Sequence, residues 1–170
     1  RVFKPTANSG GQITTFKNSE QAVIYGAEIE MLFQLSRINE SLANFSLGFN
    51  TSLMSTDVKI DLKKQGNELE NSTNRKLQGA SSWLINSDLK YDFILNKDWK
   101  NSMTLVYNVY GDRIFAVGSS GIDHIYEKSF SKLDFVWTNS ISKSIELKTG
   151  EDNIFNLSYK KEIRKKNTLN

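Results

Sequence analysis

The chain has 170 residues, a net charge of +3 and a sequence pI near 9.0. It contains no cysteine, which excludes disulfides and thiolate metal sites, and its one histidine excludes a multi-histidine metal site. No run of about 18 apolar residues occurs, so the sequence predicts no transmembrane helix. The basic residues are scattered, and the densest run, 160–166, is typical of a solvated loop, so nucleic acid is not an expected partner.

The first informative segment, 22–35, alternates between apolar and polar residues. Its apolar positions are Val23, Tyr25, Ala27, Ile29, Met31, Phe33 and Leu35, and Glu28, Glu30 and Gln34 lie between them. Because alternate side chains of a β-strand point to opposite faces, this pattern predicts an amphipathic strand.

The same alternation returns in 44–53, 82–93, 102–109 and 133–141. The apolar positions there are Phe45, Leu47, Phe49, Leu53, Trp83, Ile85, Leu89, Tyr91, Phe93, Met103, Leu105, Tyr107, Val109, Leu133, Phe135, Trp137 and Ile141. The residues between them are mostly small or polar, with Leu84 as an exception. We therefore predict an all-β, antiparallel, up-and-down chain of about seven strands, each with one apolar and one polar face.

Three features favour a transmembrane barrel wall over a soluble sandwich, which also alternates because its outer face is wet. The segments reach about 10 residues, the length that a tilted membrane strand needs. The polar faces carry small hydrophilic side chains that suit a wet lumen. The connections alternate in length, with 36–41, 94–100 and 143–144 short, 58–76 and 157–170 long, and 118–124 intermediate.

This alternation of connections also gives the predicted wall a direction. Outer-membrane barrels have short turns on the periplasmic side and longer loops outside. Tyr91, Phe93 and Trp99 then lie beside a short turn, where we expect the inner aromatic girdle. On the same assignment of faces, Leu47→Arg and Phe135→Arg should block membrane assembly, whereas Ser46→Arg should be tolerated.

Several short motifs resemble, in their order and spacing, the C-terminal part of the barrel of TonB-dependent receptors. They are YGAEIE at 25–30, RKLQGASSWLIN at 75–86, YNVYGDRI at 107–114, IYE followed by LDF within 125–135, and DNIFN at 152–156. The chain departs from the family pattern at 81–82 and at Leu157, where proline is frequent, and the alternation fails at 149–152.

The resemblance implies that residues 1–170 are the C-terminal portion of an incomplete barrel domain, without the plug domain and the final strand. Whole receptors of this kind have about 22 strands. It further implies a place in the cell outer membrane, contact with lipid, and import of a nutrient such as a metal chelate, vitamin, glycan or peptide. The TonB energy-coupling complex would act through the plug, and the chain would be no enzyme and hold no cofactor. A passive porin and a soluble β-sandwich binding module remain alternatives.

Two charged pairs are candidate sites. Glu28 and Glu30 have the spacing of paired carboxylates for acid–base catalysis, but a polar row facing the lumen explains them better. Asp112 and Arg113 fit an in-strand salt bridge better than a ligand contact near the outer rim.

The remaining candidates lie in loops. His124 lacks a plausible partner for a catalytic triad or a metal site. Gly118 and Gly121 fit a tight loop rather than a phosphate loop, because no strand-to-helix context follows. The loop 58–76 is expected to be solvated and is open to ligand contact; it carries Lys59, Asp61, Lys63, Lys64, Glu68 and Glu70. The sequence therefore predicts no catalytic, metal or cofactor residue, and it leaves the ligand-contact residues unknown.

Overall fold

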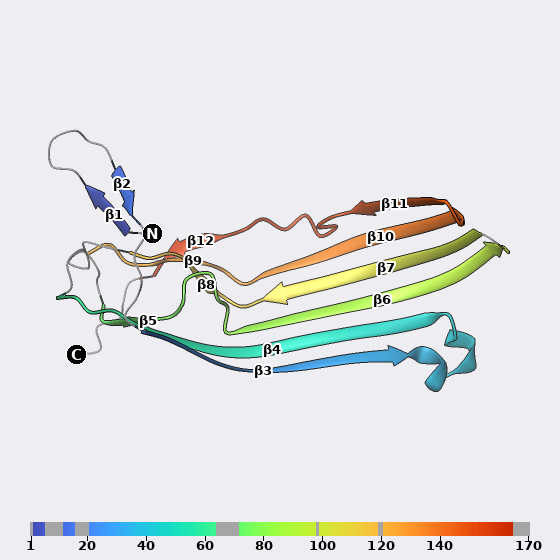
Figure 1. Cartoon of the computed structure of the whole chain (residues 1–170), viewed down its shortest axis with the longest axis horizontal. Coiled ribbons are helices and arrows are strands. Elements are labelled where there is room, and N and C mark those ends of the chain that lie inside the picture. Colours follow the sequence, from blue (N-terminus) through green and yellow to red (C-terminus); the bar gives the residue numbers. More distant parts are fainter. Residues whose placement is uncertain are drawn as a thin grey trace.

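Figure 1 shows the computed structural model, a long, gently curved ribbon of β-strands with two short 3-10 helices. The structure describes residues 2–5, 12–15, 21–63, 72–97, 99–118 and 121–164, and for the first two ranges only the strands themselves. Within those ranges, no helix has the length and apolar character needed to cross a membrane.

The strands that form the body of the ribbon follow one another in a single up-and-down sheet. They are β3 (Gln21–Gln34), β4 (Phe45–Lys59), β6 (Trp83–Asn96), β7 (Trp99–Tyr110), β10 (Phe130–Ser142) and β11 (Ile145–Glu151). Each pairs antiparallel with the next, and the short β5 (Asn74–Arg75) adds to β4, which makes a seven-stranded sheet. This confirms the predicted all-β antiparallel class.

Smaller elements lie at the two ends of the sheet. β8 (Arg113–Ala116), β9 (Ile125–Glu127) and β12 (Lys161–Ile163) form a three-stranded sheet in the order β12-β9-β8, and β1 (Val2–Pro5) pairs with β2 (Gln12–Thr15). The helices η1 (Leu35–Arg37) and η2 (Glu40–Leu42) connect β3 to β4. Figure 1 places β5, β8, β9 and β12 at one end, here called the long-connection end, and η1 and η2 at the other, the short-turn end.

The short connections agree closely with the sequence. The predicted turn 143–144 is the observed one, between Ser142 and Ile145. The predicted turn 94–100 is tighter than expected, because β6 continues to Asn96 and β7 already begins at Trp99. The predicted turn 36–41 widens to 35–44, where the side chain of Asn39 accepts a hydrogen bond from the Ser41 N–H and caps η2.

The long connections contain strands that the sequence did not predict. β4 extends to Lys59 and meets β5 inside the predicted loop 58–76, and β12 lies inside the predicted loop 157–170. β8 and β9 flank the predicted loop 118–124 and pair with each other. The parts of these loops at 64–71, 119–120 and 165–170 lie outside the described residues.

The failed alternation at 149–152 does not disturb the ladder, which stays in register from Thr149 to Glu151. β11 ends at Glu151, and the chain turns after it, where the N–H of Ile154 donates to the carbonyl of Leu133 at 2.7 Å. Asn153 and Asn156 in the following turn have φ values of 55° and 50°. Asparagine tolerates this left-handed region better than most residues, so the turn suits its sequence.

The buried apolar core of the described residues is small and lies toward the long-connection end. It consists of Val58, Ile60, Ile114 and Phe130. Most of the large apolar side chains of the six strands are at least partly exposed, so the sheet is held by its hydrogen-bonded ladder more than by a second layer.

Candidate functional site

The strand register brings the apolar positions of the sheet onto one face. Phe33 lies opposite Leu47, Leu47 opposite Leu89, Leu89 opposite Leu105, and Leu105 opposite Phe135. Side chains directly opposite one another in a ladder share a face. The faces predicted separately for each strand therefore join into one surface, here called the apolar face.

The apolar face is open. Leu105, in the middle of a central strand, is 41% exposed, and Leu53 and Phe33 are exposed as well. Within the described chain, the main contacts of each long strand are with its ladder partners, apart from a small contact of β4 with η1, and Figure 1 shows a single layer of strands along the ribbon. Contiguous apolar surface of this kind marks an interaction surface. Glu151, opposite Phe135 at the edge strand β11, interrupts the pattern.

Aromatic rings gather on this face near the short turns. Phe45 stacks on Tyr91 with 4.5 Å between ring centroids, and Tyr91 stacks on Phe93 with 5.3 Å. Trp99 begins β7 directly after the turn that follows β6. The sequence predicted Tyr91, Phe93 and Trp99 at this end, and the structure adds Phe45 to the group.

Two asparagines interrupt the apolar face beside these rings. Asn101 of β7 and Asn139 of β10 are cross-strand neighbours and are only 3% and 9% exposed. The indole Nε1 of Trp137 donates to Asn101 Oδ1 at 3.2 Å, and the indole Nε1 of Trp99 donates to Asn139 Oδ1. Each tryptophan is thus bonded to the asparagine of the other strand, and we call these four residues the Trp–Asn cluster. Sequence reasoning missed it, although the repeated W-x-N at 99–101 and 137–139 was a visible signal.

The opposite, polar face carries a row of hydrogen-bonding side chains that runs across the strands. Glu30 lies opposite Asn50, Asn50 opposite Asn86, and Asn86 opposite Asn108. Asn86 Nδ2 donates to Asn50 Oδ1 at 3.4 Å, and Asn50 Nδ2 donates to Glu28 Oε1 at 2.8 Å. Glu28 and Glu30 therefore belong to this exposed row, which is where the preferred interpretation of the sequence placed them.

A hollow of about 250 Å³ lies on the polar face toward the long-connection end. Its lining includes Ser81, Asn86, Asn108, Tyr110 and Arg113. The Ser81 hydroxyl is already occupied, since its one proton lies within hydrogen-bond distance of the carbonyls of both Trp83 and Gly111.

The predicted in-strand salt bridge between Asp112 and Arg113 is wrong. Arg113 instead pairs across to Glu127 of β9, with 3.0 Å from Nη2 to Oε1, and it also lies over the ring of Tyr110. The Tyr110 hydroxyl donates to the same Glu127 oxygen at 2.6 Å. Neighbouring residues of an extended chain point to opposite sides, which is why Asp112 and Arg113 find different partners.

Asp112 belongs to a second ion cluster, which joins the end of β7 to β9 and β12. It pairs with Lys128 and Arg164, and Glu162 pairs with the same two cations. Burial acts to raise the pKa of Asp112, but hydrogen bonds from Arg164 and the Ser129 N–H hold this pKa below its usual range. The hydrogen bond from Arg164 likewise lowers the pKa of Glu162. We call these four charged residues the β12 clamp.

The loop between β8 and β9 is built around His124. The N–H of Gly118 donates to His124 Nδ1 at 2.9 Å, so this ring nitrogen accepts a hydrogen bond that closes the loop. Gly121 has a φ of +81°, and a Cβ at Gly118 would lie 2.0 Å from the Ile122 carbonyl oxygen. The tight-loop interpretation of these two glycines is confirmed.

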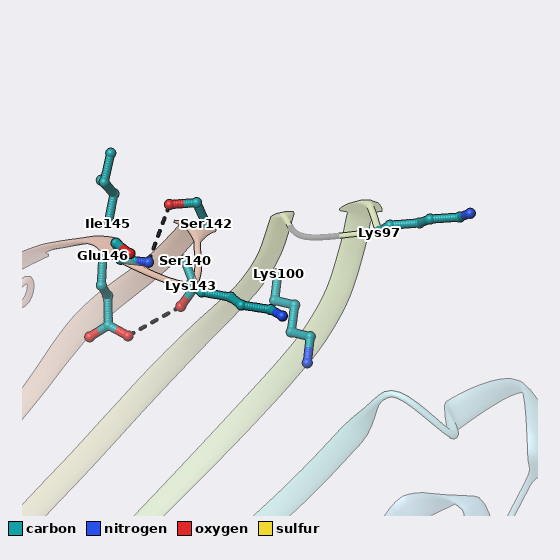
Figure 2. A pocket seen from close by; sticks show the side chains of 8 residues that line it. Lys97, Lys100, Ser140, Ser142, Lys143, Ile145 and Glu146 are labelled. Atoms are coloured by element: carbon teal, nitrogen blue, oxygen red, sulfur yellow. Dashed lines mark hydrogen bonds between the residues drawn. The ribbon is translucent and has the colours of Figure 1, made fainter.

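A hollow at the short-turn end brings three lysines near the turns after β6 and β10. Figure 2 shows Lys100 and Lys143 close to the Glu146–Ser140 pair, with Lys97 extended away from them. Ser140 Oγ donates to Glu146 Oε2 at 3.1 Å, and the Ser144 N–H donates to Ser142 Oγ. The lysines are exposed and give this end a positive surface.

Among the described residues, no three histidine, cysteine, aspartate or glutamate side chains lie close enough to hold a metal ion. What the arrangement offers is a surface with two chemically different faces and a charged end. No protein-family model, no curated protein and no solved structure matches this chain.

Proposed function

We propose that this chain forms part of the wall of an outer-membrane β-barrel, and that the barrel is a TonB-dependent receptor that imports a nutrient. One observation carries the barrel-wall proposal. The register joins the apolar positions of consecutive long strands into one continuous face, and no other described element covers it. A soluble sandwich would cover such a face with a second sheet about 10 Å away.

The strand length also supports a membrane location. Trp83 and Phe93 lie on the apolar face of β6, ten residues apart. At about 3.3 Å per residue they are separated by roughly 33 Å along the strand. A tilt of about 35–45° reduces this to roughly 23–27 Å across the membrane, close to the ~25 Å apolar band of outer-membrane barrels.

The polar face fits the wet interior of a barrel. The row from Glu30 through Asn50 and Asn86 to Asn108 presents carboxylate and amide groups on four adjacent strands. In hydrocarbon each of these groups would cost several kcal/mol, so this face belongs in water.

The receptor part of the proposal rests on the motif resemblance. Three of the motif segments fall in the long strands: 25–30 lies within β3, 83–86 begins β6, and 107–110 ends β7. DNIFN at 152–156 forms the turn after β11. On this assignment the long-connection end faces outward and meets the nutrient, and the TonB complex acts through a plug domain elsewhere in the protein.

Membrane insertion tests the wall. The whole protein that contains this chain is prepared in sealed outer-membrane vesicles and treated with protease from outside. We expect the strands from β3 to β11 to be protected and cleavage to fall in the connections. Complete digestion of β6 and β7 in the presence of lipid would refute the barrel wall.

Uptake by living cells tests the receptor. Deletion of the gene that encodes this chain should abolish import of one nutrient, and loss of TonB should abolish the same import. A passive porin would continue to import without TonB, so import that survives the loss of TonB would overturn the receptor assignment and leave the wall intact.

A further inference from the structure

Two apolar side chains interrupt the polar face at the hollow near the long-connection end. Leu84 is the exception to the alternation of β6, and Met54 stands two residues after Ser52 on the polar face of β4. The strands bring the two together, because Leu84 lies opposite Ser52 and the Met54 N–H donates to the Ser82 carbonyl at 2.8 Å. Both line the hollow, which therefore has an apolar patch beside the amide row of this face.

Two side-chain amides border this apolar patch. Asn86 and Asn108 are cross-strand neighbours, and both line the hollow. Asn86 gives a long hydrogen bond of 3.4 Å to Asn50, and no described residue forms a hydrogen bond with the side chain of Asn108. The hydroxyls of Ser81 and Tyr110, by contrast, are bonded to protein groups. The two amides therefore have hydrogen-bonding capacity left for a ligand.

The charge of the hollow is balanced within the protein. Arg113 is the one charged residue among its described lining residues. The Arg113 guanidinium pairs with Glu127 at 3.0 Å, and Glu127, which is only 5% exposed, also accepts the hydrogen bond from Tyr110. An anionic ligand group at Arg113 would be repelled at close range by this carboxylate. The hollow therefore favours a neutral ligand over an anionic one.

The size of the hollow limits what it holds. Its volume of about 250 Å³ is below the ~300–1,000 Å³ of sites that enclose a whole drug-sized molecule, so it suits one small unit of a ligand. The row from Asn108 through Asn86 and Asn50 to Glu30 continues from it over four adjacent strands. At the usual strand spacing of ~4.8 Å this row is roughly 14 Å long. A ligand made of repeating units with hydrogen-bonding groups fits along it.

We propose that the hollow binds one uncharged sugar unit of a glycan, with further units along the amide row. A sugar ring combines an apolar C–H face, which fits Leu84 and Met54, with a rim of hydroxyls that are both donors and acceptors. A side-chain amide also offers both functions, so Asn86 and Asn108 suit neighbouring hydroxyls. The proposal rests on the receptor function and deepens it, because it selects one nutrient class, a neutral glycan, from those that the receptor function leaves open.

Binding by the whole protein tests this assignment. The full-length protein that contains this chain is purified in detergent, and calorimetry measures its affinity for short neutral oligosaccharides from starch, cellulose, xylan, mannan and galactan. Asn108→Ala is compared with Thr104→Ala, which changes the polar face of the same strand outside the hollow. We expect one of these oligosaccharides to bind, Asn108→Ala to weaken its binding about tenfold through lost hydrogen bonds, and Thr104→Ala to bind it like the natural protein.

Glu127→Gln tests the charge balance of the hollow. It keeps an oxygen acceptor for Tyr110 but removes the negative charge that pairs with Arg113. The matched ligands are the bound oligosaccharide and the same oligosaccharide with its primary hydroxyls oxidised to carboxylates. We expect the natural protein to prefer the neutral form and Glu127→Gln to narrow this preference several-fold while it still binds the neutral form. A preference that Glu127→Gln leaves unchanged would overturn the selection for a neutral ligand by this ion pair.

Failure of this proposal and failure of the receptor function are distinguishable. If the whole protein binds none of the neutral oligosaccharides, or if Asn108→Ala binds them as tightly as Thr104→Ala does, the hollow is not a sugar site. TonB-dependent import of a ferric chelate, cobalamin or a peptide in place of a glycan would overturn the glycan class and leave the receptor intact. Oligosaccharide binding that depends on Asn108, together with import that survives the loss of TonB, would keep the sugar site and overturn the receptor.

Discussion

The indole of Trp83 lies against Gly111 where the ends of β6 and β7 meet. The Gly111 N–H donates to the Trp83 carbonyl at 3.1 Å, and a Cβ at position 111 would lie 2.4 Å from the indole Nε1. Only a residue without a side chain lets the ring approach the backbone so closely. Gly111 therefore fixes where this tryptophan lies.

We predict that Gly111→Ala displaces the indole and lowers the free energy of unfolding by about 1–3 kcal/mol, the usual cost of overpacking. Urea unfolding measures the loss, and the emission of Trp83 in a chain with Phe at 99 and 137 reports the displacement. Gly48→Ala is the control, because its Cβ would meet the movable carboxylate of Asp88. An equal loss in both variants would contradict the packing role of Gly111.

Leu105 and Thr104 are adjacent in the centre of β7 and point to opposite faces. We predict that Leu105→Arg destabilises membrane assembly by about 2–4 kcal/mol if this position lies near the bilayer midplane. Thr104→Arg, on the polar face beside Lys90, should assemble nearly as well as the natural chain. Heat-modifiable migration of the vesicle-inserted chain in a detergent gel gives the assembled fraction, and equal damage from both variants would count against the assignment of faces.

Thr104 is a better control than Ser46, which the sequence alone predicts to tolerate arginine. Ser46 does lie on the polar face, but it is only 9% exposed, between Gln34 and Lys90. Alternation assigns a residue to a face, because the period of a strand is local. It says nothing about how much room the neighbouring strands leave on that face.

The same distinction explains what the sequence predicted well and what it missed. The long strands have enough residues for period two to be visible, and the pattern fixes their register once one face must stay apolar. β8, β9 and β12 are too short for alternation, and contacts distant in sequence, such as Arg113 with Glu127, hold them together. The sequence pattern did not predict the Trp–Asn cluster, because Asn101 and Asn139 stand at positions where alternation leads one to expect an apolar residue.

The β12 clamp should make the docking of β12 depend on pH. The pKa values of Asp112 and Glu162 are lowered in the folded chain, so these carboxylates contribute stability above their ordinary pKa of about 4 and lose it as the pH falls through the folded values. We predict that β12 separates from β9 as the pH falls below about 4. Hydrogen exchange at the Lys128 N–H, which donates to the Lys160 carbonyl at 2.9 Å, reports the docking after correction for intrinsic exchange.

Arg164→Ala is the matched variant for this prediction. It removes one of the two cations that Asp112 and Glu162 share and leaves only Lys128 to pair with them, so the Lys128 N–H should already exchange faster at neutral pH and should respond less to acid. Protection that survives both acid and Arg164→Ala would mean that the backbone pairing of β12 with β9 suffices without the clamp.

Asp134 holds the turn that follows β11. Its carboxylate, in a residue only 8% exposed, accepts hydrogen bonds from Lys132 and from the backbone N–H of Asn153 at 2.8 Å. Asp134→Ala leaves that N–H without its acceptor, and we predict a loss of about 1–3 kcal/mol together with faster hydrogen exchange at Asn153 and Ile154. Asp152→Ala is the control, because the Asp152 side chain is 89% exposed and 3.8 Å from Lys132. If Asp152→Ala loosens the turn as much as Asp134→Ala does, the general negative charge around Lys132, rather than the bond to Asn153, holds the turn in place.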